Sequence, residues 1–216
     1  MSVEQLESLI IGGGQAGIAM SAQLSKRGRP HLVLEQHRIA ERWRSERWDG
    51  LPLQSPNSEV RFSDYSFPYT DPDGFASAGD IANFITAIAD AVAAPVRCGV
   101  AATNMRRGDN GAGFRIETSL GPIEAANVVL ATGPFQRPII PALLPKDADI
   151  FQVHAGAYRN PDQLPDGAVL VVGCGASGSQ IADELMRAGR ACIFPLVGTA
   201  DCRVGIVDTL TVGGGE

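Results

Sequence analysis

The sequence is short of cysteine, of basic residues and of long apolar runs. Its 18 Lys and Arg against 24 Asp and Glu leave a net charge of −6, which argues against nucleic acid or an anionic membrane surface as a partner. No apolar run approaches the ~20 residues of a membrane span, and the N-terminus lacks the charged and apolar segments of a signal peptide. We therefore expect a cytoplasmic protein that binds neither membranes nor nucleic acids.

The cysteines are too scattered to indicate a metal or redox centre. No two of them form a Cys-x-x-Cys pair, and none has a histidine at metal-ligand spacing. The sequence therefore predicts no metal site and no dithiol centre. It also lacks a Ser-His-Asp or paired-carboxylate pattern that would indicate a hydrolase. The cysteines are Cys98, Cys174, Cys192 and Cys202.

An apolar run that ends in Gly-x-Gly-x-x-Gly organises the N-terminal half of the chain. Residues 9–11 read as a strand, and the residues after the motif have the pattern of a helix. Gly12 supplies backbone angles that a side chain would forbid, Gly14 lets a pyrophosphate approach the backbone, and Gly17 lets helix and strand pack closely. Unpaired N–H groups at the helix N-terminus would then face the phosphates. The variable positions inside the motif include Gln15 and Ala16.

A second predicted strand supplies an acidic residue suited to a ribose contact. Gly28 and Pro30 end the helical pattern, and the apolar residues 31–34 lead into Glu35. A carboxylate about 20 residues after the glycines can accept hydrogen bonds from a ribose 2′-hydroxyl. The alternative interpretation is a solvated acid at the end of a strand.

The stretch 36–70 is irregular and rich in aromatic residues, which either line a planar ligand or cover the core. A helix follows over 81–92. Ser77 or Asp80 can cap this helix, and Pro95 ends it.

Beyond that helix the pattern changes to alternation of apolar and polar residues, which predicts a small antiparallel β insertion. An apolar strand over 127–133 then returns to a parallel sheet and offers its carboxyl end to a ligand. The alternating apolar positions are Val96, Cys98, Phe114 and Ile116, with Thr118 after them.

A second Gly-x-Gly-x-x-Gly motif repeats the design of the first. It follows a proline-rich stretch, 136–165, that has the character of a domain boundary. The apolar residues 168–172 precede the motif, and a helix is predicted over 179–188. Two such motifs, each between an apolar strand and an amphipathic helix, indicate two dinucleotide-binding folds. The candidate residues of the second motif are Gly173, Gly175, Ala176, Ser177 and Gly178.

These motifs together resemble the N-terminal part of the flavin-containing and Baeyer–Villiger monooxygenases, flavoproteins with two dinucleotide-binding domains. The resemblance runs from Leu9 to Arg190 and includes both fingerprints and the pair His154 and Tyr158. It implies that the first fingerprint and Glu35 hold FAD and that the second fingerprint holds NADPH. The matching segments add further cofactor-binding candidates, which are Trp43, Arg44, Gln54, Thr132 and Gly133.

The resemblance also implies the fold and the reaction. We expect an α/β protein with a Rossmann-like FAD-binding domain over 1–145, which contains the antiparallel insertion, and the start of a Rossmann-like NAD(P)-binding domain over 146–216. The implied reaction is the FAD- and NADPH-dependent oxidation of a small-molecule substrate, with the chemistry carried by the cofactor. No catalytic residue is assigned, because His154 suits a catalytic role and a structural hydrogen bond equally well.

The sequence also departs from that family. Ala148 and Ile150 stand where the family usually has Phe and Gly, and the residues from about 199 onward are atypical, for which we hypothesise a shift of reading frame. The chain stops soon after the first helix of the second fold, so we expect truncation to impair activity and uncovered sheet edges to promote self-association. Two alternatives stay open: a non-catalytic nucleotide-binding fragment or gene-decay product, and another flavin reductase with two dinucleotide-binding domains.

Overall fold

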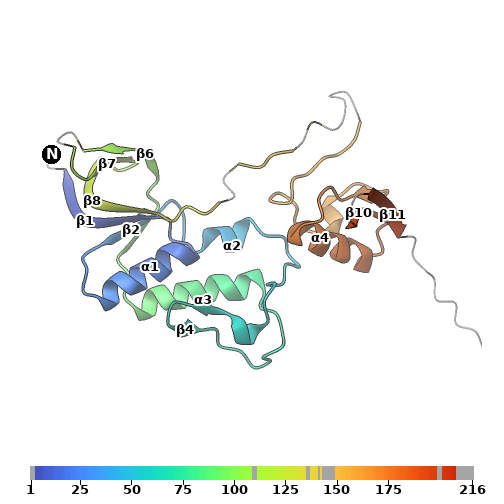
Figure 1. Ribbon diagram of the computed structural model, residues 1–216, viewed down its shortest axis with the longest axis horizontal. Coiled ribbons are helices and arrows are strands. Elements are labelled where there is room, and N and C mark those ends of the chain that lie inside the picture. The colour runs from blue at the N-terminus through green and yellow to red at the C-terminus, as the bar shows by residue number, and fades with distance from the viewer. Residues whose placement is uncertain are drawn as a thin grey trace, which may run out of the picture. The chain divides into compact units, whose positions relative to one another are not determined.

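The computed structural model of the chain describes residues 3–108, 111–134, 137–140, 142, 149–198 and 201–207, with side chains up to Phe194. The chain forms two compact units (Figure 1). The first unit comprises Met1–Glu46 and Pro52–Arg137, and the second comprises Arg47–Leu51 and Pro138–Glu216. The segment 47–51, which the sequence analysis places within the first domain, is thus part of the second unit.

The first unit is built on a six-stranded sheet in the order β5-β2-β1-β8-β7-β6. The pairs β1–β2, β1–β8 and β2–β5 are parallel, whereas β6–β7 and β7–β8 are antiparallel. Since β1 lies between β2 and β8, the carboxyl ends of three parallel strands meet at one edge of the sheet, where ligands bind in open α/β sheets. The strands are β1 (Glu4–Ile11), β2 (Leu32–Glu35), β5 (Val96–Cys98), β6 (Ala102–Arg107), β7 (Phe114–Thr118) and β8 (Ile123–Leu130).

The antiparallel insertion is confirmed for β6 and β7, but the placement of Val96 and Cys98 within it is wrong. These residues form β5, in which Val96 pairs with Val33 and Cys98 with Glu35 in a parallel ladder. Three residues are too few to distinguish a half-buried antiparallel strand from a parallel one by their alternation alone.

Among the described residues of the first unit, the α-helices are α1 (Gln15–Lys26), α2 (Glu41–Ser45) and α3 (Ala78–Ala91). The helix predicted over 81–92 is confirmed as α3, which begins at Ala78, and both proposed caps take part. The Ser77 side chain accepts a hydrogen bond from the Asp80 N–H, and the Asp80 carboxylate accepts one from the Ser77 N–H, which forms a capping box.

Aromatic residues of the stretch 36–70 pack into the core beside α3. The Phe84 ring on α3 lies 5.3 Å from that of Phe62 and 5.4 Å from that of Phe67. Trp43 and Tyr65 pack against the same buried cluster. For these side chains the structure favours the core-covering interpretation. The stretch also holds a 3-10 turn at Asn57–Glu59 and a hairpin of β3 (Arg61–Phe62) and β4 (Tyr65–Ser66).

The second unit is a smaller βαβ arrangement. Its sheet has the order β11-β10-β9, in which β9 (Val169–Leu170) and β10 (Cys192–Gly198) are parallel and β11 (Asp201–Val207) is antiparallel to β10. A 3-10 turn, Pro161–Gln163, precedes β9, and α4 (Ala176–Arg187) joins β9 to β10. In the atypical tail, residues 201–207 form β11, while 199–200 and 208–216 lie outside the described residues.

Helix α4 covers one face of that small sheet. Leu185 is fully buried, together with Ile181 and Ala182. Leu170 of β9 and Val172, which follows the strand, remain 60% and 61% exposed. In the described part of the chain, no helix is both long and apolar enough to cross a membrane.

Candidate dinucleotide-binding sites

The first fingerprint makes a tight turn between β1 and α1. Gly12 has φ +113°, and its N–H donates to the Leu34 carbonyl at 2.8 Å. A Cβ on Gly12 would lie 2.8 Å from the Ala131 carbonyl carbon, and a Cβ on Gly17 would collide with the Gly12 carbonyl oxygen. Both glycines are therefore required by the packing of the turn itself.

Gly14 differs from its two neighbours because the space beside it is open. A Cβ at this position would meet no atom within 4 Å. Gly14 is the N-cap of α1, with no side chain bonded to the cap, and the first turn of α1 holds no acidic residue. The first helical hydrogen bond is donated by Ile18 to Gly14, so the N–H groups of Gln15 and Ala16 have no acceptor within the helix. This combination of open space and free donors suits a phosphate.

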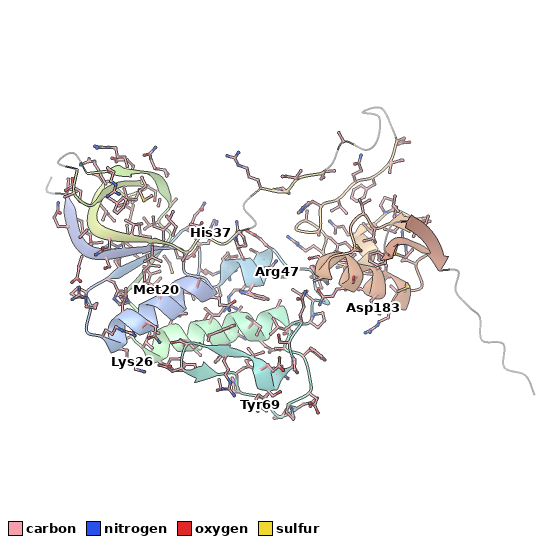
Figure 2. All side chains as sticks on the ribbon, in the orientation of Figure 1. Met20, Lys26, His37, Arg47, Tyr69 and Asp183 are labelled. Carbon is pink, nitrogen blue, oxygen red and sulfur yellow. The ribbon has the colours of Figure 1, made fainter. Side chains whose placement is uncertain are left out.

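Glu35 is held beside this turn by two backbone N–H groups. Its Oε2 accepts from the Gly13 N–H at 2.7 Å, and its Oε1 accepts at 2.9 Å from the N–H of His37, a residue labelled in Figure 2. The acidic residue at the end of β2 thus lies beside the fingerprint, and its contact with a ribose hydroxyl stays a prediction. The Gly13 carbonyl in turn accepts from the N–H of Ala40, which directly precedes α2.

Thr132 and Gly133 follow β8 at the same edge of the sheet. The Ala131 N–H donates to the Ile11 carbonyl at 2.8 Å, which holds the end of β8 against the end of β1. Gly133 has φ +79°, and a Cβ there would lie 3.7 Å from Nη1 of Arg42. The structure therefore brings Thr132 and Gly133, both exposed, to the end of β1 at which the fingerprint begins.

The remaining first-site candidates have different surroundings. Arg44 donates to the Asn83 Oδ1 and the Thr86 Oγ1, each at 3.1 Å, which fastens α2 to α3. Trp43 packs against the core, and Gln54 is exposed. Their part in cofactor binding stays a prediction.

The second fingerprint repeats three properties of the first, although a Cβ on Gly173, unlike one on Gly12, would meet no atom within 4 Å. Gly173 has φ +105°, a Cβ on Gly178 would collide with the Gly173 carbonyl oxygen, and a Cβ on Gly175 would meet no atom within 4 Å. Gly175 caps α4 without a side-chain bond, and the first turn of α4 again holds no acid. Ala176 and Ser177 are exposed in that turn. Two turns with matching constraints thus open two helices in one chain.

His154 and Tyr158 belong to a loop that packs on α4. His154 Nδ1 accepts from the Gly156 N–H at 3.0 Å, and its carbonyl accepts from the N–H groups of Ala157 and Tyr158, which favours a structural role for the histidine. The buried Tyr158 hydroxyl donates to Oε2 of Glu184 at 2.8 Å. Burial first, and then the neighbouring Glu184 carboxylate, raise the pKa of Tyr158, so this phenol stays protonated.

Sequence reasoning missed Glu184 and its contact with Gly50. A Cβ on Gly50 would overlap the position of Oε1 of Glu184, so that carboxylate lies directly against the Gly50 backbone. Nothing in the local pattern of α4 sets Glu184 apart from other polar residues of an amphipathic helix.

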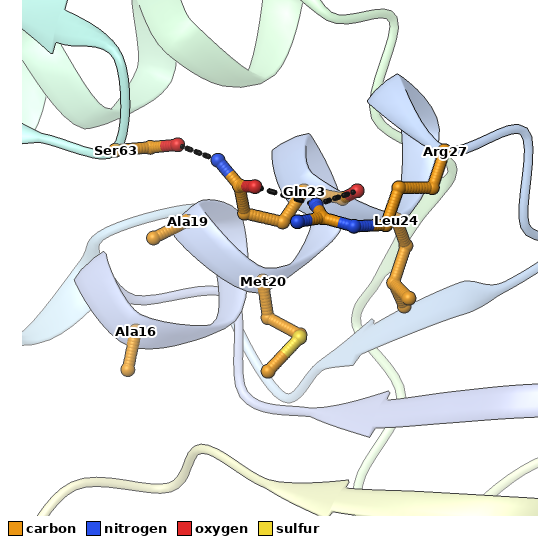
Figure 3. Close-up of a pocket in the computed structure, with 7 residues that line it drawn as sticks. All are labelled: Ala16, Ala19, Met20, Gln23, Leu24, Arg27 and Ser63. Carbon is orange, nitrogen blue, oxygen red and sulfur yellow. Dashed lines mark hydrogen bonds between the residues drawn. The ribbon is translucent and has the colours of Figure 1, made fainter.

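A hollow of about 510 Å³ lies along the outer face of α1 (Figure 3). In it, Gln23 donates to Ser63 Oγ at 2.5 Å and accepts from Arg27 at 2.6 Å. Of the fingerprint residues, only Ala16 lines the hollow, so the hollow lies beside the glycine turn rather than in it. Among the residues with described side chains, no group of three or more His, Cys, Asp or Glu could hold a metal ion.

Comparison with known proteins agrees with this geometry. An uncharacterized CzcO-like oxidoreductase of Geobacillus kaustophilus is 35% identical over 83% of this chain and 51% of its own length. A probable indole-3-pyruvate monooxygenase of Arabidopsis thaliana, YUCCA1, is 31% identical over 83% of this chain and 44% of its own length. The chain thus spans about half the length of these curated relatives.

The fold also matches a solved flavin-containing monooxygenase from Stenotrophomonas maltophilia, with a TM-score of 0.79 and 21% identity over 90% of this chain and 59% of that one. The resemblance to flavin monooxygenases and the α/β, Rossmann-like fold are therefore confirmed. A family model matches residues 9–194, and on that match the chain belongs to the pyridine nucleotide-disulphide oxidoreductase family.

Proposed function

We propose that the chain binds FAD at the first fingerprint and NADPH at the second, as part of a flavin-dependent monooxygenase that acts on a small molecule in the cytoplasm. The observation that carries the proposal is the repetition of one geometry: a glycine with positive φ, an open glycine at the helix N-cap and a glycine packed on the first. Such turns bind the pyrophosphate of a dinucleotide. Two of them in one chain support two dinucleotides.

The surroundings of the two turns support different ligands for each. Glu35 lies beside the first turn, with its carboxylate oriented by the Gly13 and His37 N–H groups, and can accept a hydrogen bond from a ribose hydroxyl. A relative named as a monooxygenase supports oxygenation, the name of the similar flavin-containing monooxygenase structure supports a flavin, and the family name supports a pyridine nucleotide. The choice of NADPH over NADH rests on the resemblance to monooxygenases.

The chain's own residues would bind and orient the cofactors. The N–H groups that open α1 and α4 donate to phosphate oxygens, and the positive ends of both helix dipoles favour the negative charge. When bound, FAD supplies the electron-transfer and oxygen chemistry. The chain spans about half of the length of the relatives it matches. Catalysis by the whole protein is therefore itself a part of the proposal.

A nucleotide-binding module without turnover is the second candidate. The observation that favours it is the exposure of two apolar residues in the second unit, Leu170 of β9 and Val172 directly after it, which are 60% and 61% exposed. A dinucleotide-binding domain with helices on both sides of its sheet would bury these residues.

The visible absorption spectrum of the purified chain, before and after it is mixed with FAD and freed of excess, tests the proposal. We expect a yellow protein with about one flavin per chain, and NADPH should then bleach the flavin band. Flavin uptake without bleaching would support the binding module. A chain that takes up no flavin would contradict the proposed monooxygenase, and a chain that binds neither FAD nor NADPH would contradict both candidates.

A further inference from the structure

We propose that residues 40–51, which we call the strap, couple the two nucleotide sites energetically. A ligand bound at the second fingerprint then makes the backbone of the first fingerprint more ordered. The inference rests on the proposed function, because it needs a nucleotide at the second fingerprint. The strap is the part of the chain that leaves the first fingerprint, enters the second unit and returns.

The N-terminal end of the strap is fixed to the first fingerprint. The Ala40 N–H donates to the Gly13 carbonyl at 3.0 Å, and Ala40 is buried with φ 58°, a left-handed conformation that a non-glycine residue keeps only when its surroundings impose it. Helix α2 follows directly and is fastened to α3 by Arg44. Movement of α2 therefore acts on the carbonyl of the phosphate-binding turn.

The C-terminal part of the strap is built into the second unit. Trp48 is 5% exposed and packs in the cluster that contains Leu185 of α4. The Asp49 N–H donates to the Arg159 carbonyl at 2.8 Å, and its Oδ2 accepts from Asn160 at 2.6 Å. The chain then returns to the first unit, where the Leu53 N–H donates to Ala76.

Glu184 joins the strap to the helix that opens at the second fingerprint. One carboxylate oxygen accepts from the buried Tyr158 hydroxyl, and the other lies against the Gly50 backbone. Glu184 lies on α4, whose N-terminus is capped by Gly175 of the fingerprint. A ligand that restrains α4 therefore also restrains the residue on which Gly50 rests.

The part of the strap that joins these attachments is short in sequence. Only Glu46 and Arg47 separate the end of α2 from the buried Trp48. A contiguous series of packed and hydrogen-bonded groups that is fixed at both ends can transmit order without a large displacement. Couplings between sites of this kind typically change an affinity about 5- to 150-fold, and the effect is reciprocal.

Hydrogen exchange of the whole chain, with and without NADP⁺ as the probe, tests the proposal. We expect NADP⁺ to slow exchange at 173–188, at 47–51 and at 12–14, and to leave the β3–β4 hairpin at 61–66 unchanged. In parallel, NADP⁺ should change the dissociation constant of FAD by about 5-fold or more.

Two variants locate the coupling in the strap. Gly50→Ala places a methyl group where the Glu184 carboxylate lies, and Tyr158→Phe keeps the buried ring but removes the hydrogen bond that holds Glu184. Either variant should keep NADP⁺ protection at 173–188 and lose it at 12–14, with the FAD effect near 1-fold. Gly79→Ala is the matched control, since its Cβ would lie 3.7 Å from the Ser77 Oγ, an ordinary contact.

The outcomes separate this inference from the proposed function. Protection confined to 173–188 overturns the coupling and leaves the function standing. No protection at 173–188 overturns both. Equal loss of coupling in Gly79→Ala and Gly50→Ala also overturns the assignment to the strap.

Discussion

Gly14 and Gly17 stand three residues apart in one motif, and the structure predicts opposite consequences for their replacement by alanine. At Gly17 the new methyl group would collide with the Gly12 carbonyl oxygen, so α1 must move away from β1. At Gly14 the methyl group would meet no protein atom within 4 Å, and the backbone angles, φ −84° and ψ −168°, suit any residue. It would instead occupy the space through which a phosphate approaches.

The magnitudes differ accordingly. Forcing an extra methyl group into a packed contact costs about 1–3 kcal/mol, which corresponds to a fall in Tm of about 2–12 °C at this chain length. For Gly14→Ala, the loss of a favourable N-cap residue and the reduced entropy of the unfolded chain nearly offset each other. Loss of one charged hydrogen bond to phosphate, about 1.5–3 kcal/mol, would weaken FAD binding by about 10- to 150-fold.

Thermal unfolding followed by circular dichroism, with FAD titration followed by flavin fluorescence, measures both effects. We expect Gly17→Ala to have a lower Tm than the unmodified chain. Gly14→Ala should keep the Tm of the unmodified chain but bind FAD more weakly. The reasoning is refuted if Gly14→Ala binds FAD as the unmodified chain does, or if Gly17→Ala melts unchanged. Gly175→Ala and Gly178→Ala repeat the comparison at the second fingerprint, with NADPH as ligand.

Three further predictions concern the fold. Arg97 holds the pKa of Glu4 below its usual range through hydrogen bonds of 2.8 and 2.9 Å, so the stabilising effect of this pair is present above the ordinary glutamate range and is lost as the pH falls through the lowered pKa. Thermal melts of Glu4→Gln at several pH values should show a deficit of at most about 1 kcal/mol near neutrality, because the pair is partly exposed, and none in acid. Leu185→Ala should cost about 2–5 kcal/mol in urea denaturation, since the side chain is fully buried. In the described chain, β8 beyond Ala125 pairs only with β1, which leaves one edge of this strand unpaired and open to another chain. Light scattering should therefore detect self-association that Ala126→Lys reduces, and a monomer would contradict this.

Much of the site could be predicted because its constraints are local. A glycine with positive φ, an open N-cap and a packed third glycine are properties of six consecutive residues, and both fingerprints have them. The position of Glu35 was predictable as well. It ends β2, which pairs in parallel with β1, so its carboxyl end lies beside the turn that follows β1. The cap of α3 likewise follows from Ser77 and Asp80 at capping-box spacing.

The features that the sequence analysis missed depend on distant contacts or on very short elements. Helix α2 has only five residues and follows Ala40, whose left-handed backbone conformation no sequence pattern predicts. Helix α4 begins at Ala176 rather than Ser179, because the small residues of its first turn leave the apolar pattern incomplete. Trp48 lies among aromatic residues that pack in the first unit, and only its contacts show that it packs in the second.

The discontinuous second unit also has a consequence for the synthesis of the chain. Asp49 and its partner Asn160 are 111 residues apart in sequence. At a synthesis rate of about 5–20 residues per second, roughly 6 to 22 s pass between the appearance of the two residues. During that time the Trp48 indole cannot be buried, because α4, against which it packs, is synthesised later still. The nascent chain therefore exposes an aromatic side chain that chaperones can bind.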